Sequence, residues 1–147
     1  MATELLRPTL VREHEDWLDE MQEAMGPARQ AEAGTWARWN ALRYLESTFP
    51  DRVERERQMV RAVADRLTEP QRARLWALGE LLELFPAYLA RTIGLCHRAE
   101  EFGALTGRLE AALDRWCRAV EEELGPLPVT ALPPKLREAK LGAAAIR

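Results

Sequence analysis

A chain of 147 residues with a formal net charge of −3 is long enough for one domain with a substantial hydrophobic core. Its composition, 47% hydrophobic and 31% charged, excludes an intrinsically disordered protein. No apolar run approaches the roughly 20 residues that span a bilayer, so no membrane partner is expected. The acidic balance argues against nucleic acid as a partner, because binding to phosphates needs a concentrated basic surface.

The N-terminal sequence MATELLRPTL lacks the basic and apolar regions of a signal peptide. Two cysteines, Cys96 and Cys117, are too few for a disulfide scaffold and do not form a metal-binding CxxC pair. We therefore expect a cytoplasmic protein. All cationic side chains except Lys135 and Lys140 are arginines, a composition typical of a GC-rich bacterial genome.

The first two predicted helices follow from apolar residues at helical spacing. One runs from Leu10 to Met25, and Gly26-Pro27 is expected to end it. The other covers 36–67 and contains Pro50, which removes a backbone donor and clashes with the preceding turn. A kink is therefore expected at Pro50.

The third predicted helix begins at LTEPQ, where Thr68 and Gln71 have the spacing of a capping box. Its apolar residues run from Leu75 to Cys96, with Pro86 as a second kink or break. The fourth covers 105–124 and ends at Gly125-Pro126.

No segment shows the alternating pattern of a strand, so the fold class is predicted to be all-α. Short connections favour an antiparallel up-down four-helix bundle over residues 1–125, with kinked second and third helices. The alternative is six shorter helices, if Pro50 and Pro86 break their helices.

Residues 126–147 form a proline-rich basic tail that is expected to be extended, because Pro133-Pro134 favours polyproline geometry. Two interpretations remain open for it. The tail is a mobile terminus or a strap across the bundle, or it is a peptide that docks on another protein through apolar anchors at Leu132, Leu136 and Leu141.

His14 lies on the apolar seam of the first helix, where a histidine is either hydrogen-bonded within the core or bound to a ligand. The segments REHEDW, FPDRVERERQMV and WCRAVEEELGPL resemble the hemerythrin-like four-helix bundles over residues 8–127. This resemblance implies a two-iron site. Its ligands are a histidine on the first helix, His-x-x-x-Glu on the second, further histidines on the third and His-x-x-x-Asp/Glu on the fourth.

Most of those ligands are missing here. His14 matches the first ligand and Glu56 the second-helix glutamate, but Arg52 occupies the position of the second-helix histidine. In the fourth helix, Arg118-Glu122 has the spacing without a histidine. His97 is predicted to lie roughly 25 Å from Glu56 along the bundle, because each helical residue advances the chain by about 1.5 Å. We therefore expect the two-iron site to be absent.

Three interpretations of His14 and Glu56 remain. They form a buried polar pair, with Arg52 or Arg43 close by, that fixes how the helices pack. Alternatively they hold a single iron or zinc ion or a small ligand. In the third interpretation, one of the two is simply exposed.

Four tryptophans, Trp17, Trp36, Trp39 and Trp116, are predicted to lie in the core. The segment LWALGELLELFPAYL is apolar over more than one face, which would suit an interaction surface that includes Trp76, Leu84 and Tyr88.

The favoured hypothesis is a non-catalytic interaction or regulatory protein without a cofactor. It would bind itself or a partner protein through the third helix and the tail. The alternative is a sensor or oxidative protein with metal or ligand at His14 and Glu56. A HEPN-type ribonuclease is a distant third, since the R-x(4–6)-H spacing of Arg91 and His97 also occurs at Arg7 and His14.

Overall fold

The computed structural model describes residues 2–29, 31, 35–93 and 99–127. Its α-helices are α1 (Ala2–Arg29), α2 (Trp36–Arg43), α3 (Phe49–Ala62), α4 (Glu69–Ile93) and α5 (Ala99–Leu124). A π-helical segment, Tyr44–Thr48, joins α2 to α3, and a short 3-10 turn, Ala64–Arg66, precedes α4. The described ranges contain no strand, so the predicted all-α class is confirmed for them.

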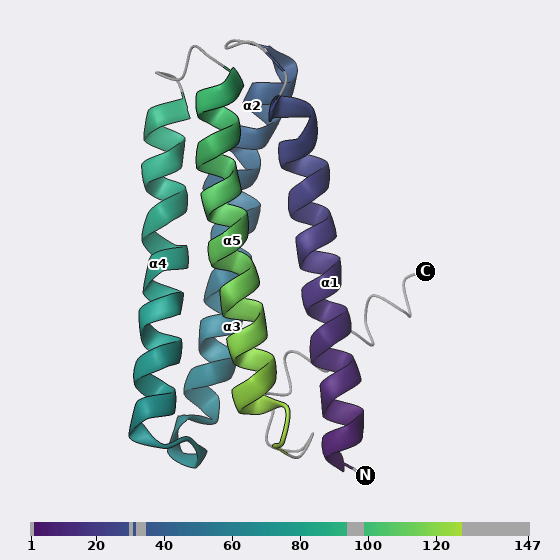
Figure 1. Ribbon diagram of the computed structural model, residues 1–147, viewed down its shortest axis with the longest axis vertical. Helices are drawn as coiled ribbons and strands as arrows, with labels where there is room; N and C mark the ends of the chain where they lie inside the picture. The colour runs from purple at the N-terminus through teal and green to yellow at the C-terminus, as the bar shows by residue number, and fades with distance from the viewer. Residues whose placement is uncertain (1, 30, 32–34, 94–98, 128–147) are drawn as a thin grey trace.

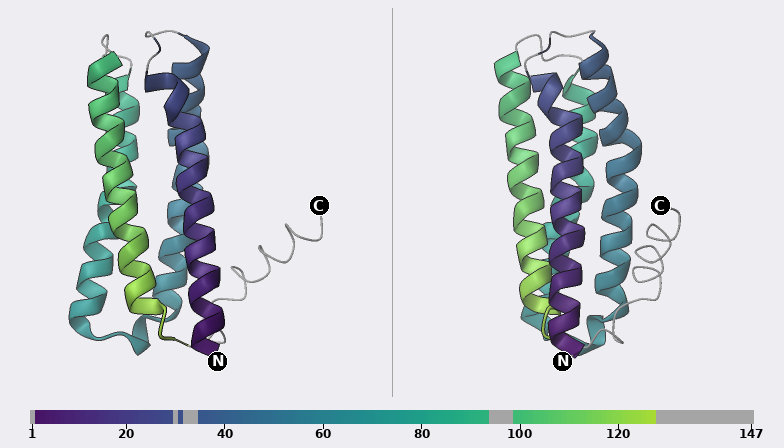
Figure 2. Two further views of the ribbon diagram at one scale, coloured as in Figure 1. Left: turned by 45° about the vertical axis from the view of Figure 1, so that its right-hand side comes forward. Right: turned by 90° about the vertical axis from the view of Figure 1, so that its right-hand side faces the viewer.

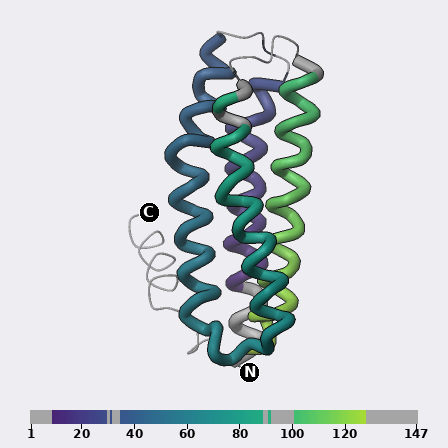
Figure 3. Tube along the Cα trace, turned by 90° about the vertical axis from the view of Figure 1, so that its left-hand side faces the viewer, coloured from purple at the N-terminus to yellow at the C-terminus, as the bar shows by residue number. Residues whose placement is uncertain are grey.

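Four of these helices, α1, α3, α4 and α5, lie side by side with their axes near the long axis of the molecule (Figure 1). The same arrangement is visible in the two turned views (Figure 2). α5 packs against both α1 and α4, and α4 also packs against α3. Figure 3 shows the side of the molecule on which α4 lies. None of the described helices has the length and apolar character needed to cross a membrane.

Both prolines lie within helical backbone, so neither divides its helix in two. Pro86 is inside α4. Pro50 stands in the first turn of α3, directly after the π-helical segment, where the Phe49 N–H donates to the Tyr44 carbonyl. A π turn changes the local register of backbone hydrogen bonds, which helps a helix to accommodate a residue that has no N–H to donate.

Two predicted helix ends are wrong. α1 continues past Gly26-Pro27 to Arg29, because its last turn is held by tertiary contacts: Ala28 is fully buried, and Arg29 forms an ion pair with Glu110 of α5. The second predicted helix ends at Ala62 instead of Leu67. The next residue, Val63, has φ −112° and ψ 12°, outside the helical range.

The predicted start of α4 is confirmed. The Thr68 N–H donates to Gln71 Oε1 at 2.6 Å, and the Gln71 N–H donates to Thr68 Oγ1 at 3.4 Å. These reciprocal bonds form the capping box that the sequence indicates.

Trp17 and Trp116 lie in the core as predicted, but Trp36 is 73% exposed and Trp39 is 44% exposed. The prediction for these two was wrong because it linked Trp36, Trp39, Leu42 and Leu45 by three steps of three residues. Each such step falls about 60° short of a full turn, so Trp36 faces nearly opposite to the buried Leu45. The two exposed rings contact each other, with centroids 4.8 Å apart.

Candidate functional site

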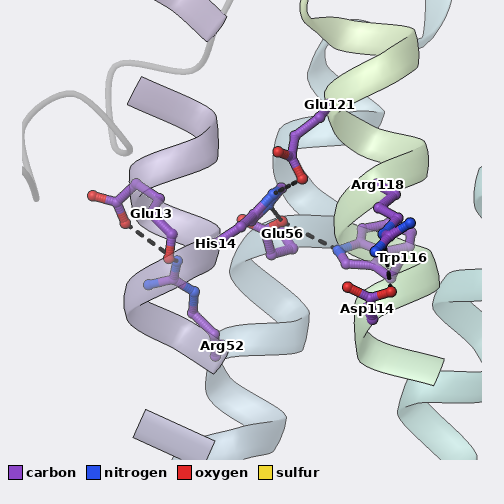
Figure 4. A network of polar contacts seen from close by, with 8 residues as sticks. All are labelled: Glu13, His14, Arg52, Glu56, Asp114, Trp116, Arg118 and Glu121. Atoms are coloured by element: carbon purple, nitrogen blue, oxygen red, sulfur yellow. Dashed lines mark hydrogen bonds and ion pairs between the residues drawn. The ribbon is translucent and has the colours of Figure 1, made fainter. Parts of the chain in front are cut away.

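Three helices bring polar side chains together inside the core. His14 of α1 lies one turn from each of the buried residues Leu10 and Trp17, and Glu56 of α3 lies between the buried residues Val53 and Val60. His14 and Glu56 are each only 2% exposed. Their positions on the apolar seams of two helices therefore direct both side chains to the same interior space (Figure 4).

The pairing of His14 with Glu56 that the sequence allows is present. His14 Nε2 lies 2.7 Å from Glu56 Oε1, and His14 Nδ1 lies 3.1 Å from Glu121 Oε2 of α5. Carboxylates accept hydrogen bonds, and only the protonated imidazolium has an N–H at both ring positions. The geometry is therefore that of a histidine cation between two carboxylates.

Trp116 of α5 completes the interior cluster. Its indole Nε1–H donates to Glu56 Oε1 at 3.1 Å, so this one oxygen accepts from both Trp116 and His14. We use the name interior cluster for His14, Glu56, Trp116 and Glu121, which Figure 4 shows pointing toward one another from three helices.

The charges of the interior cluster stabilise one another. Burial alone would lower the pKa of His14, but attraction to Glu56 and hydrogen bonds with Cys117 and Glu56 raise it to about 11. Burial alone would raise the pKa of Glu56, but the charge and hydrogen bond of His14 lower it below its ordinary value, with further contributions from Arg52 and Trp116. At neutral pH both partners are therefore charged.

A second ion pair borders the cluster. The Arg52 guanidinium lies 3.2 Å from Glu13 Oε2, also donates to the Glu13 carbonyl, and sits over the Trp17 ring at 5.2 Å. Of the two arginines that the sequence offered as neighbours of the His14–Glu56 pair, Arg52 is the one that lies close to it. Arg43, the other, lies over the exposed Trp39 ring instead.

Only Glu121 connects the interior cluster with solvent, since its side chain is 27% exposed. A surface hollow of about 240 Å³ opens beside it, lined by Leu10, Val11, Glu121 and Glu122. The protonated ring, by contrast, is enclosed.

The positions that correspond to hemerythrin ligands have other contacts. Arg52 is paired with Glu13, and Arg118 is an exposed side chain paired with Asp114, as Figure 4 also shows. The two carboxylates that reach His14 approach opposite nitrogens of its ring, so they do not converge with it on one point. Among the described residues, no three His, Cys, Asp or Glu side chains are grouped so that they could hold a metal ion.

Sequence reasoning missed Glu121 as a partner of His14. The candidate pair in the fourth helix was Arg118-Glu122, but Arg118 is exposed and forms its ion pair with Asp114. A usable signal was the spacing of Glu121 four residues after the buried Cys117, which places it at the edge of the apolar face.

The predicted interaction residues of α4 are exposed. Trp76 is 40%, Leu84 is 65% and Tyr88 is 57% exposed, and Leu81 on the same helix is 42% exposed. The interaction residues predicted in the tail, Leu132, Leu136 and Leu141, lie outside the described residues, as does His97.

Comparisons with protein-family models, with curated proteins and with solved structures find no match for this chain. The resemblance to hemerythrin-like bundles therefore rests on the sequence segments alone.

Proposed function

We propose that the protein is a non-catalytic helical interaction module that binds a protein, either a second copy of itself or another chain, through the outward face of α4. The observation that carries this proposal is the exposure of Leu84 and Tyr88, at 65% and 57%, on a helix whose opposite face is buried. Large apolar side chains gathered on one exposed face are typical of protein interaction surfaces. The tail, with its apolar residues, is proposed as a second part of the binding surface.

The proposed architecture is an antiparallel up-down bundle related to the hemerythrin-like proteins, with the site of the irons replaced by an internal ion pair. The order of colours along neighbouring helices in Figure 1 supports the up-down direction. The occupation of both His14 nitrogens by carboxylates supports the replacement. A cytoplasmic location is proposed because Cys117 is a free buried thiol, as is common in a reducing compartment.

Affinity capture with matched variants tests this function. Wild type is expected to retain a partner that Leu84→Glu loses, because the new carboxylate would have to be buried unpaired in the interface. Trp36→Glu is the control, since it changes a similarly exposed apolar side chain on α2 instead of α4. Equal binding by wild type and Leu84→Glu would contradict the proposal.

The alternative of a metal or small ligand at His14 and Glu56 requires the ring to release a carboxylate before it can coordinate. Elemental analysis of wild type and His14→Ala tests it directly. If wild type contains stoichiometric iron or zinc and the variant does not, the protein is a metal-binding sensor or oxidative protein, and the proposal of an interaction module is wrong.

A further inference from the structure

Two prolines on neighbouring helices line one hollow in the surface between α3 and α4, which we call the α3–α4 hollow. Its volume is about 470 Å³. Pro50 and Pro86 lie in its wall together with Leu45 and Ala87. The two helices run beside each other on the side of the molecule that Figure 3 shows. A hollow of this size with apolar walls has the dimensions of a site for a small organic molecule.

The ion pair of Arg57 with Glu83 fixes which residues of the two walls are level with each other. Val60, which follows Arg57 on α3, lies by Leu75, which precedes Glu83 on α4. Residues before Arg57 on the first wall are therefore level with residues after Glu83 on the second. Glu83 itself lines one end of the α3–α4 hollow.

The other end of the α3–α4 hollow carries two opposite charges. Arg91 lies eight residues after Glu83, about 12 Å along the axis of α4. Glu46 lies eleven residues before Arg57, about 16 Å along the opposite wall. Arg91 and Glu46 therefore stand at the same end, on opposite walls. No hydrogen bond or ion pair joins the side chain of either one to another described residue.

Pro50 adds a further acceptor at this end. A proline has no N–H, so the helix carbonyl that it would otherwise serve has no donor. This carbonyl belongs to Leu45 in the π register that precedes Pro50, and to Glu46 in the α register that follows. Both residues line the hollow. A carboxylate and a carbonyl without a donor together suit a group with several N–H donors, such as an ammonium.

We propose that the α3–α4 hollow binds a free α-amino acid with an apolar side chain. The ammonium of the ligand donates to the Glu46 carboxylate and to the neighbouring carbonyl without a donor. The carboxylate of the ligand accepts from the Arg91 guanidinium. Its side chain leaves water and lies against Pro50, Pro86 and Ala87 in the middle of the hollow.

The two opposite charges distinguish this ligand from a simple amine or a simple carboxylic acid. An amine brings a second cation beside Arg91, and a carboxylic acid brings a second anion beside Glu46. Only a ligand with both charges pairs both side chains. Binding of an amino acid here goes beyond the proposed interaction function and does not depend on it.

Isothermal titration calorimetry with the full chain tests the proposal. The ligands are L-leucine and L-phenylalanine, and the matched probes are phenethylamine and hydrocinnamate, which keep the phenyl ring and have only one of the two charges. We expect L-phenylalanine to bind at least about tenfold more tightly than either probe, because each probe lacks one charge-assisted contact. Binding of either probe as tightly as L-phenylalanine would overturn the proposal. The absence of binding by both amino acids at up to about 10 mM would do the same.

Two variants locate the site. Arg91→Gln and Glu46→Gln should each weaken the binding of L-phenylalanine by about tenfold or more. Both side chains are exposed, so both variants should keep the helical circular dichroism of wild type. Glu80→Gln is the control, because Glu80 is exposed on α4 outside the lining of the hollow, and this variant should bind as wild type does. Unchanged affinity in either Arg91→Gln or Glu46→Gln would overturn the proposal.

Discussion

His14 Nε2 lies 2.7 Å from Glu56 Oε1 between two helices, and both side chains are almost completely buried. Two charges leave water to form this contact, so the contact contributes to stability only while both partners are present. The pair links α1 to α3, and the second bond of the ring, to Glu121, links α1 to α5. The interior cluster therefore constrains how three helices pack.

The first prediction is that His14 and Glu56 each stabilise the fold only while the other is present. Glu56→Gln is expected to lower the free energy of unfolding by about 3–5 kcal/mol, because it leaves His14 buried without its main counter-charge. His14→Leu should lower the free energy of unfolding by a similar amount. The double variant His14→Leu/Glu56→Leu should lose only about 1–3 kcal/mol, chiefly because the Trp116 N–H then lacks its acceptor.

Urea unfolding of wild type, His14→Leu, Glu56→Leu and the double variant measures this coupling. Glu56→Leu should lose at least as much free energy of unfolding as Glu56→Gln, because it also removes the oxygen that accepts from Trp116. Asp114→Asn serves as a control, because its partner Arg118 is 74% exposed and the pair should contribute less than about 1 kcal/mol. Additive losses in the double variant would show that the two side chains do not act as a pair.

The second prediction concerns pH. The pKa of His14 is raised in the folded protein to about 11, so its contribution is fully present below the unfolded value near 6.5 and is lost as pH rises toward 11. The pKa of Glu56 is lowered, so its contribution is present above the unfolded value near 4.5 and is lost as pH falls below it. The pair should therefore stabilise the fold most between about pH 4.5 and 6.5.

The measurement is the free energy of unfolding of wild type minus that of His14→Gln/Glu56→Gln, determined at several pH values. Between pH 7 and 9 the difference should fall by up to about 1.4 kcal/mol per pH unit. A difference that stays constant over this interval would mean that His14 is not protonated in the folded state.

The burial of His14 and Glu56 and the exposure of the outward face of α4 could be predicted from the sequence. Each depends only on where a residue falls around its own helix. His14 and Glu56 each occupy an apolar seam, and a polar residue on a seam must find a partner inside. The contact of Glu121 with His14 could not be predicted in the same way. It lies at the edge of the α5 seam, and whether an edge residue reaches a neighbour depends on how α1 and α5 rotate against each other.

The error at Trp36 has a different origin. Tryptophan is a common core residue, and steps of three residues are compatible with a helix when they alternate with steps of four. Three such steps in succession turn the side chain away from the core, so the spacing itself contained the answer. The end of α1 was misplaced for a third reason, since the buried Ala28 and the ion pair of Arg29 override the local effect of Gly26-Pro27.

The third prediction separates Glu121 from Glu56. Glu121→Gln retains an oxygen that can accept from His14, and the site is 27% exposed, so water can replace part of the lost interaction. We expect a loss of about 0.5–1.5 kcal/mol, well below that of Glu56→Gln. Urea unfolding of the two variants under one set of conditions decides this, and equal losses would mean that Glu121 is as important as Glu56 for holding the charged ring.

The fourth prediction compares two tryptophans that the sequence did not distinguish. Trp17 is 1% exposed and its ring contacts Phe49, with centroids 5.5 Å apart, whereas Trp36 is 73% exposed. Trp17→Ala should lower the free energy of unfolding by about 3–5 kcal/mol, because it leaves a large cavity in the core. Trp36→Ala should change it by no more than about 0.5 kcal/mol, since the side chain gives up little buried area. Thermal or urea unfolding of both variants provides the test. A large loss of unfolding free energy in Trp36→Ala would mean that the Trp36 ring makes contacts that stabilise the fold. Trp36→Glu would then be unsuitable as the control for the α4 surface.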